Sequence, residues 1–383
     1  MPRATHDIPP PLGLYVHWPY CARICPYCDF NVALDRRPGE SAALGEAILA
    51  DLKAQASQIG ERTLVSIFFG GGTPSLMDPA LVAEIVGMAK GLWPSADLEV
   101  TLEANPTDAE AGRFSAFAAA GVNRLSLGVQ ALDNVALEFL GRNHFASEAR
   151  RAARLAAGLF PRLSVDLIYA RPGQTPEAWA AELLAALDLG AEHVSPYQLT
   201  IEPGTPFDRA VRRKAFTPAD PDLAAILYET TQEVLTGQGF SAYEVSNHAR
   251  GDAARSRHNL VYWRGQDYLG VGPGAHGRIT HGGRRVATET ARAIPAYIAQ
   301  VAKAGTGVTE REALTPVQAA EERLLLGLRV DEGVYLGDLE PLKLARLADL
   351  RDAGFVAVKG GRLFATAQGR PVLDRIIAEL ALD

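Results

Sequence analysis

Residues 21–28 read Cys-Ala-Arg-Ile-Cys-Pro-Tyr-Cys, and this window contains all three cysteines of the 383-residue chain. The spacing C-x3-C-x2-C lets three thiolates surround one metal centre, and the chain has no further cysteine to act as a ligand. Thiolates normally hold the irons of an iron–sulfur cluster, so three of them leave one iron of a cubane open to a substrate or cofactor. The window therefore predicts a [4Fe–4S] cluster bound by Cys21, Cys25 and Cys28.

Two other uses of these cysteines stay open. Zinc accepts thiolate and imidazole ligands, and His17 lies four residues before Cys21, so a Cys3His zinc site is possible. A disulfide fits less well, because the cysteine count is odd and the first residues lack the apolar core of a signal peptide. Clustered thiols in a cytosolic protein more often bind metals or act in catalysis. We expect a cytoplasmic location.

Charge and hydropathy exclude two classes of protein. The formal net charge of −7 argues against a general nucleic-acid binder. No apolar run approaches the roughly eighteen residues that a membrane helix requires, so we expect no transmembrane segment.

The chain alternates short apolar runs with segments of helical spacing. Strands are expected at 14–17, 65–69, 98–102, 124–127, 164–168 and 193–199, and helices at 39–59, 79–92, 108–120 and 176–189. The apolar runs lack strict alternation, which is typical of parallel strands buried on both faces. Repeated βα units imply a parallel sheet or barrel, and six units are fewer than a closed (βα)8 barrel contains. The predicted fold is α/β, a partial, open (βα)6 barrel.

Unusual residues follow several of these strands. The second strand ends in Gly-Gly-Gly-Thr-Pro at 70–74, the third in Glu-Ala-Asn-Pro at 103–106, and the fourth in Gly-Val-Gln at 128–130. Ordinary turn chemistry explains any one of them. The carboxyl ends of barrel strands build the active site, however, and the repetition beside a cysteine loop favours a site.

The pattern changes toward the C-terminus. Helices at 316–328, 343–353 and 371–380 flank a hairpin at 355–365 that turns at Gly360-Gly361, an order that resembles a winged-helix module. No basic stripe appears there, so we expect no nucleic-acid partner. The predicted division is a disordered segment at 1–12, the barrel at 13–240, an extension at 241–310, and a winged-helix-like domain at 311–383.

Taken together, these motifs resemble the radical S-adenosylmethionine (SAM) superfamily. The resemblance rests on C-x3-C-x2-C after a first strand, Tyr27 just before the last cysteine, and the Gly-rich segment at 70–74. Almost the whole chain resembles the oxygen-independent coproporphyrinogen oxidase group and, within it, the heme chaperone branch. The resemblance implies that SAM chelates the open iron through its amino and carboxylate groups, and that an electron donor is needed if SAM is cleaved.

The resemblance also implies which residues contact SAM. They are Tyr15, Tyr27, Gly72, Thr73, Glu103, Gln130, Arg142 and Asp166. Taken singly, such residues have ordinary roles: Asp166 could cap a helix, and Arg142 could be a solvated surface charge.

The chain departs from the oxidase at two places. Phe30 stands where the oxidase has a further cysteine, and only twenty residues precede Cys21 where the oxidase has a long extension. Oxygen-independent coproporphyrinogen III oxidase is therefore the alternative function, and whether the protein is an enzyme stays open. Arg171 is a further departure, since the family usually has an apolar residue there.

The segment His-Asn-Leu-Val-Tyr-Trp at 258–263 resembles the HNxxYW motif linked to heme binding. Imidazole is a common axial ligand of heme iron, which suggests His258, while Tyr262 and Trp263 could stack on the macrocycle. The alternative is a hydrogen-bonded histidine with aromatic neighbours in the core, and His276 is a rival ligand. The resemblance implies a chaperone that binds the cluster, SAM and heme. It would pass heme to an acceptor such as a membrane respiratory cytochrome, touching the membrane only through that partner.

Overall fold

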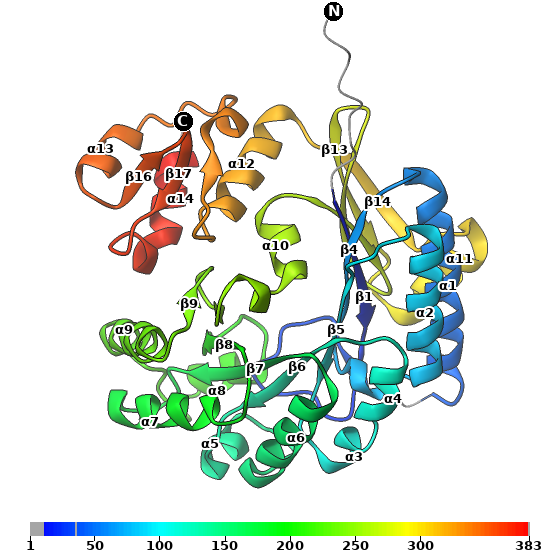
Figure 1. Ribbon diagram of the computed structural model, residues 1–383, viewed down its shortest axis with the longest axis horizontal. Helices are drawn as coiled ribbons and strands as arrows, with labels where there is room; N and C mark the ends of the chain where they lie inside the picture. Colours follow the sequence, from blue (N-terminus) through cyan, green and yellow to red (C-terminus); the bar gives the residue numbers. More distant parts are fainter. Residues whose placement is uncertain (1–10, 35–36, 382–383) are drawn as a thin grey trace, which may run out of the picture.

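The computed structural model describes residues 11–34 and 37–381, so most of the predicted N-terminal segment lies outside it. Its main body is a curved sheet of twelve strands in the order β14-β13-β12-β11-β1-β4-β5-β6-β7-β8-β10-β9. Figure 1 shows this sheet as an arc with helices along its convex side. Among the described residues no pairing joins the end strands β14 and β9, so the barrel is partial and open, as predicted.

The middle of the sheet is parallel and contains all six predicted strands. Its members are β11 (Asp267–Val271), β1 (Leu12–Trp18), β4 (Leu64–Gly71), β5 (Glu99–Ala104), β6 (Arg124–Gln130), β7 (Arg162–Tyr169) and β8 (His193–Gln198). Antiparallel strands extend both edges: β12 (His276–His281), β13 (Arg284–Thr290) and β14 (Val308–Ala313) on one side, β10 (His248–Ala249) and β9 (Ser241–Ala242) on the other.

The connecting helices cover the outer face. They include α1 (Glu40–Ile59), α2 (Pro79–Leu92), α5 (Asn134–Phe139), α6 (Ala146–Leu159), α7 (Pro176–Leu187), α8 (Pro206–Arg212), α9 (Pro221–Gly237) and α11 (Ile294–Ala304). Leu14, Val16 and Ile67 are fully buried in the core that these helices share with the sheet. The expected helix at 108–120 is divided into α3 (Asp108–Ala111) and α4 (Phe114–Ala119). Arg113 stands at the break and donates to the carbonyls of Ser75 and Met77.

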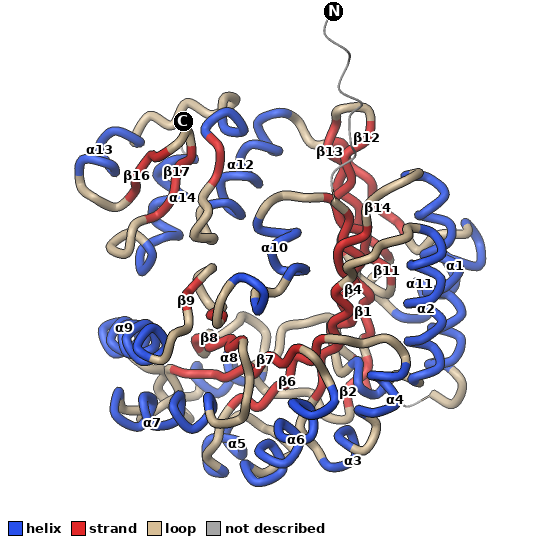
Figure 2. Tube along the Cα trace, viewed as in Figure 1, coloured by secondary structure: helices blue, strands red, loops and turns tan. Residues whose placement is uncertain are grey.

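One helix lies on the inner side of the sheet. Figure 2 shows α10 (Arg257–Trp263) within the curve of the strands, where it contacts β4, β1 and β11. The chain therefore fills part of its own barrel interior with the segment that carries the HNxxYW motif.

The C-terminal module has a core of its own. It comprises α12 (Pro316–Gly327), β15 (Val334–Tyr335), α13 (Leu347–Asp352), β16 (Val356–Lys359), β17 (Arg362–Ala365) and α14 (Leu373–Ala381), with the strands in the order β15-β17-β16. Leu324, Val334 and Leu363 are buried in this core. The predicted hairpin is confirmed by the β16–β17 pairing. The expected boundary at 310/311 falls inside β14.

Within the described ranges, no helix combines the length and the apolar character that a bilayer-spanning segment needs.

Candidate functional site

A short parallel strand pair fixes the cysteine loop. β2 (Tyr20–Cys21) pairs with β3 (Ala33–Leu34), so both ends of the segment between them are anchored. Asn31 within this segment donates to the carbonyl of Pro273 at 2.8 Å and to that of Arg292 at 2.9 Å. The loop therefore lies beside the carboxyl ends of β1 and β11, the edge where the sequence predicts the site.

The three cysteines line one cavity of about 500 Å³. Their thiols are free and half-buried. In residues 11–34 and 37–381, no three His, Cys, Asp or Glu side chains converge on a single ion position.

His17, the candidate fourth zinc ligand, is engaged elsewhere. Its Nδ1 lies 2.9 Å from the Tyr15 hydroxyl and its Nε2 lies 2.8 Å from the Asn31 carbonyl oxygen. The imidazole also covers Gly71 (φ 111°), where an added Cβ would come within 2.6 Å of the ring. His17 thus braces the ends of β1 and β4, and Tyr15 contacts it there instead of lining the cavity.

Burial controls the ionisation of two of the thiols. It raises the pKa of Cys28 to about 11, and it raises the pKa of Cys21 despite a hydrogen bond with Thr73. Such thiols stay protonated at neutral pH until a cation binds them, so metal uptake would release protons. The guanidinium of Arg142, whose Nη1 lies 3.3 Å from the Cys25 Sγ, places one fixed positive charge beside this loop.

Arg142 and Gln130 present unsatisfied polar atoms at the same place. Arg142 donates to the Asn105 side chain and, at 3.2 Å, to the Gly128 carbonyl, yet its Nε has no partner. Gln130 holds a left-handed backbone conformation (φ 64°), and its Oε1 is buried without a partner. Orphaned buried polar groups are costly, and a polar ligand in the cavity would satisfy them.

Gly72 and Thr73 line the cavity where β4 ends. The Gly72 amide donates to the Trp18 carbonyl at 2.7 Å, and the Thr73 amide to the Tyr20 carbonyl at 2.9 Å. A Cβ on Gly72 would approach the Pro19 carbonyl oxygen to 2.6 Å. A larger side chain at Gly72 would therefore collide with the backbone that leads into Cys21.

Two buried carboxyl groups also line the cavity. Burial, reinforced by the nearby Asp166 charge, raises the pKa of Glu103 to about 8. Burial also raises the pKa of Asp166, although its carboxylate accepts from Ser126 at 3.1 Å. The Gly71 amide donates to Glu103 at 3.3 Å and ties that side chain to the Gly-rich turn. Such groups can accept hydrogen bonds from an amine or hydroxyl.

The cavity brings together most of the predicted site. Its wall includes Cys21, Cys25, Tyr27, Cys28, Gly72, Thr73, Glu103, Gln130, Arg142 and Asp166. It does not include Tyr15, His258, Tyr262 or Trp263.

The HNxxYW segment forms helix α10, and His258 is 1% exposed. Its Nδ1 lies 2.8 Å from the Ser66 hydroxyl and its Nε2 lies 2.7 Å from the Tyr262 hydroxyl. Burial lowers the pKa of His258 to about 3, so the ring is neutral. Neither nitrogen is free here, and iron ligation by His258, which stays a prediction, would require both hydrogen bonds to rearrange.

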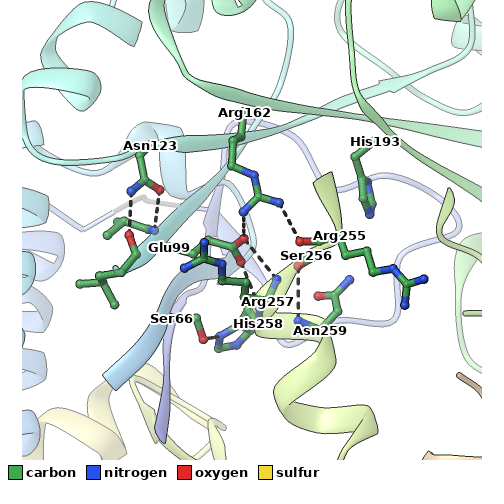
Figure 3. Close-up of polar contacts among 12 residues, drawn as sticks. Ser66, Glu99, Asn123, Arg162, His193, Arg255, Ser256, Arg257, His258 and Asn259 are labelled. Carbon is green, nitrogen blue, oxygen red and sulfur yellow. Dashed lines mark hydrogen bonds and ion pairs between the residues drawn. The ribbon is translucent and has the colours of Figure 1, made fainter. Parts of the chain in front are cut away.

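The start of α10 is anchored by a buried carboxylate (Figure 3). Glu99 accepts from the amides of Arg257 at 3.2 Å and His258 at 3.1 Å, and it pairs with Arg162. Anions at a helix N-terminus are stabilising. At the other end, Trp263 packs under the Arg329 guanidinium at 4.9 Å.

His276 differs from His258 in access. It begins β12, its side chain is 59% exposed, and Nε2 is 3.9 Å from a Glu289 oxygen. It does not line the cavity.

Known proteins match this chain along most of its length. Residues 15–185 match the Radical SAM superfamily, and residues 314–372 match the HemN C-terminal domain. The heme chaperone HemW of Escherichia coli is 41% identical and aligns over 73% of this chain and 74% of its own. The Bacillus subtilis HemW is 33% identical over 93% and 95%. The chain belongs to the HemW family of the radical SAM superfamily.

Other relatives extend the comparison. A bovine mitochondrial protein named Radical S-adenosyl methionine domain-containing protein 1 is 41% identical over 96% of this chain and 87% of its own. Among solved structures, coproporphyrinogen III oxidase (HemN) from E. coli superposes with a TM-score of 0.82. That match covers 98% of this chain and 91% of the oxidase at 23% identity, and it establishes the fold alone.

Two departures of this chain now have a place in the structure. Phe30 is 65% exposed at the edge of the cavity, so no further thiol stands there. Arg171, whose presence the sequence does not explain, forms a buried ion pair with Glu182 of α7. Glu182 also accepts from the Leu132 amide at 2.7 Å. The pair therefore ties the turn after β7 to the turn after β6, next to Gln130.

Sequence reasoning missed part of the cavity wall. Arg124, Ser126, Ser195, Tyr197 and Asn259 also line it. A signal existed in β6, where alternate positions from Arg124 to Gln130 are polar or glycine and the residues between them are apolar. Side chains alternate across a strand, so these positions share the inner face. Asn259 had no such signal, because it reaches the cavity from α10.

Proposed function

We propose that this protein is a heme chaperone. It would hold a [4Fe–4S] cluster on Cys21, Cys25 and Cys28, bind SAM beside it, and pass heme to an acceptor protein such as a membrane respiratory cytochrome. One observation carries the proposal. In a chain of the HemW family, a single cavity joins three half-buried thiols to unsatisfied polar side chains.

The residues around the cavity suit SAM. Gly72 and Thr73 form part of the wall, Glu103 and Asp166 supply acceptors for its amine and hydroxyls, and Gln130 offers an unused carbonyl. The cluster, when bound, supplies an open iron and an electron, while the protein orients SAM and limits water. An electron donor is a further partner if SAM is cleaved.

Heme contact is proposed for Tyr262 and Trp263, with His258 or His276 as the axial ligand. His276 is the more accessible of the two in the described arrangement. We place the protein in the cytoplasm, where it would touch the membrane only through its heme acceptor, and we propose no nucleic-acid partner.

Anaerobic reconstitution followed by heme titration tests the proposal. The reconstituted protein should bind heme, read from its Soret absorbance with and without SAM, and should lose it to a heme-free b-type cytochrome. Absence of heme binding would refute the chaperone function. Conversion of coproporphyrinogen III to protoporphyrinogen IX with SAM and a reductant would establish the oxidase alternative. Phe30 argues against this alternative, because the oxidase has a further cysteine at that position.

A further inference from the structure

A basic segment lies beside the cysteine loop. Residues 209–214 read Arg-Ala-Val-Arg-Arg-Lys, and they span the end of α8 and the turn that follows it. Four of these six residues are cations and none is acidic, although the whole chain carries a net charge of −7. All four cations, Arg209, Arg212, Arg213 and Lys214, are exposed. We call them the α8 basic patch.

Helix α8 begins against the cysteine loop. The Phe207 amide donates to the Pro26 carbonyl at 3.0 Å, and the centroid of the Phe207 ring lies 6.3 Å from that of Tyr27. Pro26 and Tyr27 stand between the second and third cysteines. From Phe207 to Arg213 the helix rises by about 9 Å, at about 1.5 Å per residue. The α8 basic patch is therefore a near neighbour of the metal-binding loop.

Aromatic packing holds this patch in place. Phe216 follows the patch, and its ring centroid lies 5.1 Å from that of Phe207 and 5.2 Å from that of Phe139 on α5. The Phe207 and Phe139 rings also stack, with their centroids 4.8 Å apart. Both ends of segment 209–214 are thus attached to one aromatic cluster, which gives the four charges a fixed base.

Interactions within the helix explain only half of the patch. Arg209 and Arg212 lie in the last turn of α8, where cations interact favourably with the helix dipole, and Arg212 pairs with Asp208 at 2.7 Å. Arg213 and Lys214 follow the helix, and their side chains form no hydrogen bond or ion pair with any described residue. These two exposed charges are therefore available to another molecule.

The surroundings leave the patch positive and add apolar surface. Glu138 of α5 is an exposed acid next to the aromatic cluster, and on the cysteine loop the exposed Arg23 and Asp29 offset each other. The same loop exposes Ile24 by 41% and Phe30 by 65%. Exposed apolar side chains beside polar and charged ones are typical of surfaces that contact another protein.

We propose that the α8 basic patch docks a small acidic protein that carries one electron to the cysteine loop. The inference rests on the proposed function, in which an electron donor is a partner when SAM is cleaved. The carrier would lose one electron and the bound cluster would gain it, with no bond made or broken. The position beside the three thiols favours an electron carrier over an anionic membrane, because only the carrier has something to deliver to that loop. Complementary charges speed and orient such encounters, which bury little surface.

Binding of an acidic plant-type [2Fe–2S] ferredoxin tests the docking. Its affinity is measured for the full-length, cluster-loaded wild type, for the double variant Arg213→Glu/Lys214→Glu, and for the control Arg284→Glu/Lys359→Glu. Arg284 of β13 and Lys359 of β16 are likewise exposed, and their side chains have no partner among the described residues. Both double variants change the net charge by the same amount, so they separate the effect of position from that of total charge. Iron content and thermal unfolding are checked for each protein.

At about 20 mM salt, the patch variant should bind ferredoxin about 10-fold more weakly than the wild type, and the control variant should match the wild type. The difference should disappear at about 0.5 M salt, where exposed charges are screened. Reduction of the cluster by pre-reduced ferredoxin should slow in the patch variant. Reduction by dithionite, which needs no docking, should keep its wild-type rate.

Three results would overturn the inference. They are equal ferredoxin affinity in the wild type and the patch variant, an equal loss in the control variant, or a loss of binding to phosphatidylserine vesicles with ferredoxin binding intact. The last result would identify a membrane contact. If the patch variant does not assemble its cluster, Arg213→Gln/Lys214→Gln decides by the same comparison, with a smaller expected loss.

The proposed function fails separately from the docking. A wild type that binds ferredoxin through the patch but binds no heme would refute the chaperone function and keep the docking surface. A wild type that binds heme, with a ferredoxin affinity independent of the patch, would keep the chaperone function and refute the docking surface.

Discussion

Replacing Arg171 by Leu, an apolar residue of the kind usual in the family, should destabilise the protein. Each partner of the Arg171–Glu182 pair has a side chain only 9% exposed. Removing Arg171 leaves the Glu182 carboxylate buried with the Leu132 amide at 2.7 Å and the Gln174 side-chain amide at 3.4 Å as its remaining donors.

The size of the effect follows from this environment. Breaking a buried ion pair by removing one partner typically costs about 3–5 kcal/mol. Two donors still reach Glu182, and two nitrogens of Arg171 lack partners already, so we expect the lower end, about 3 kcal/mol. A second change, Glu182→Gln, removes the stranded charge and keeps an acceptor for the Leu132 amide. The double variant should therefore recover about 2 kcal/mol, a coupling of the size seen between contacting residues.

Urea unfolding of the cluster-free protein, followed by circular dichroism, measures these differences. The control is Arg212→Leu, because Arg212 pairs with Asp208 on the surface with a side chain 72% exposed, and such a pair contributes about 0–1 kcal/mol. An Arg171→Leu variant within about 0.5 kcal/mol of wild type, or single and double variants of equal stability, would refute this reasoning.

Four further outcomes can be checked. Changing any one of the three cysteines to Ala should lower the iron and sulfide content of reconstituted protein to background, and full retention would contradict the cluster assignment. Gly72→Val should lower iron content together with SAM affinity, because the new side chain meets the backbone before Cys21; intact iron with lost SAM binding would speak against this. The pKa of Glu103 is about 8 in the folded protein and 4.5 for the free carboxyl. Between pH 4.5 and pH 8, unfolding therefore releases a proton from Glu103. The free energy of unfolding should fall in this range as the pH rises, by up to about 1.4 kcal/mol per pH unit. Urea unfolding measured at a series of pH values should show this fall in the wild type and a smaller fall in Glu103→Gln. Parallel pH profiles for the two proteins would contradict a raised pKa of Glu103. His258→Ala should lower the free energy of unfolding by about 1–3 kcal/mol, because it leaves the Ser66 and Tyr262 hydroxyls without their partner. If His258 ligates heme iron, the Soret band of this variant should also shift. An unchanged Soret band would contradict this ligand assignment, and His276 would be tested next.

Local sequence is enough to specify the elements whose causes are local. Asp78 accepts from the Ala80 amide at 2.9 Å with Pro79 at the first helical position, and this cap–proline pair starts α2 where the pattern predicts it. The six predicted parallel strands follow from apolar runs, and the cysteine window follows from the spacing of three thiols. Their register placed most of the predicted SAM residues in one cavity, because parallel strands bring their carboxyl ends to one edge.

Tertiary structure decided the features that depend on contacts between distant segments. Helical spacing at 108–120 gave no sign of the break, which comes with the bonds of Arg113 to carbonyls more than thirty residues earlier. The HNxxYW motif specifies residue types, but the position of His258 inside the barrel depends on Glu99 and Ser66, which lie some 160 to 190 residues away. Arg124 reads as an ordinary charge at the start of a strand. Only the folded sheet buries it in the wall of the cavity, because burial and distance are properties of the folded chain and not of local sequence.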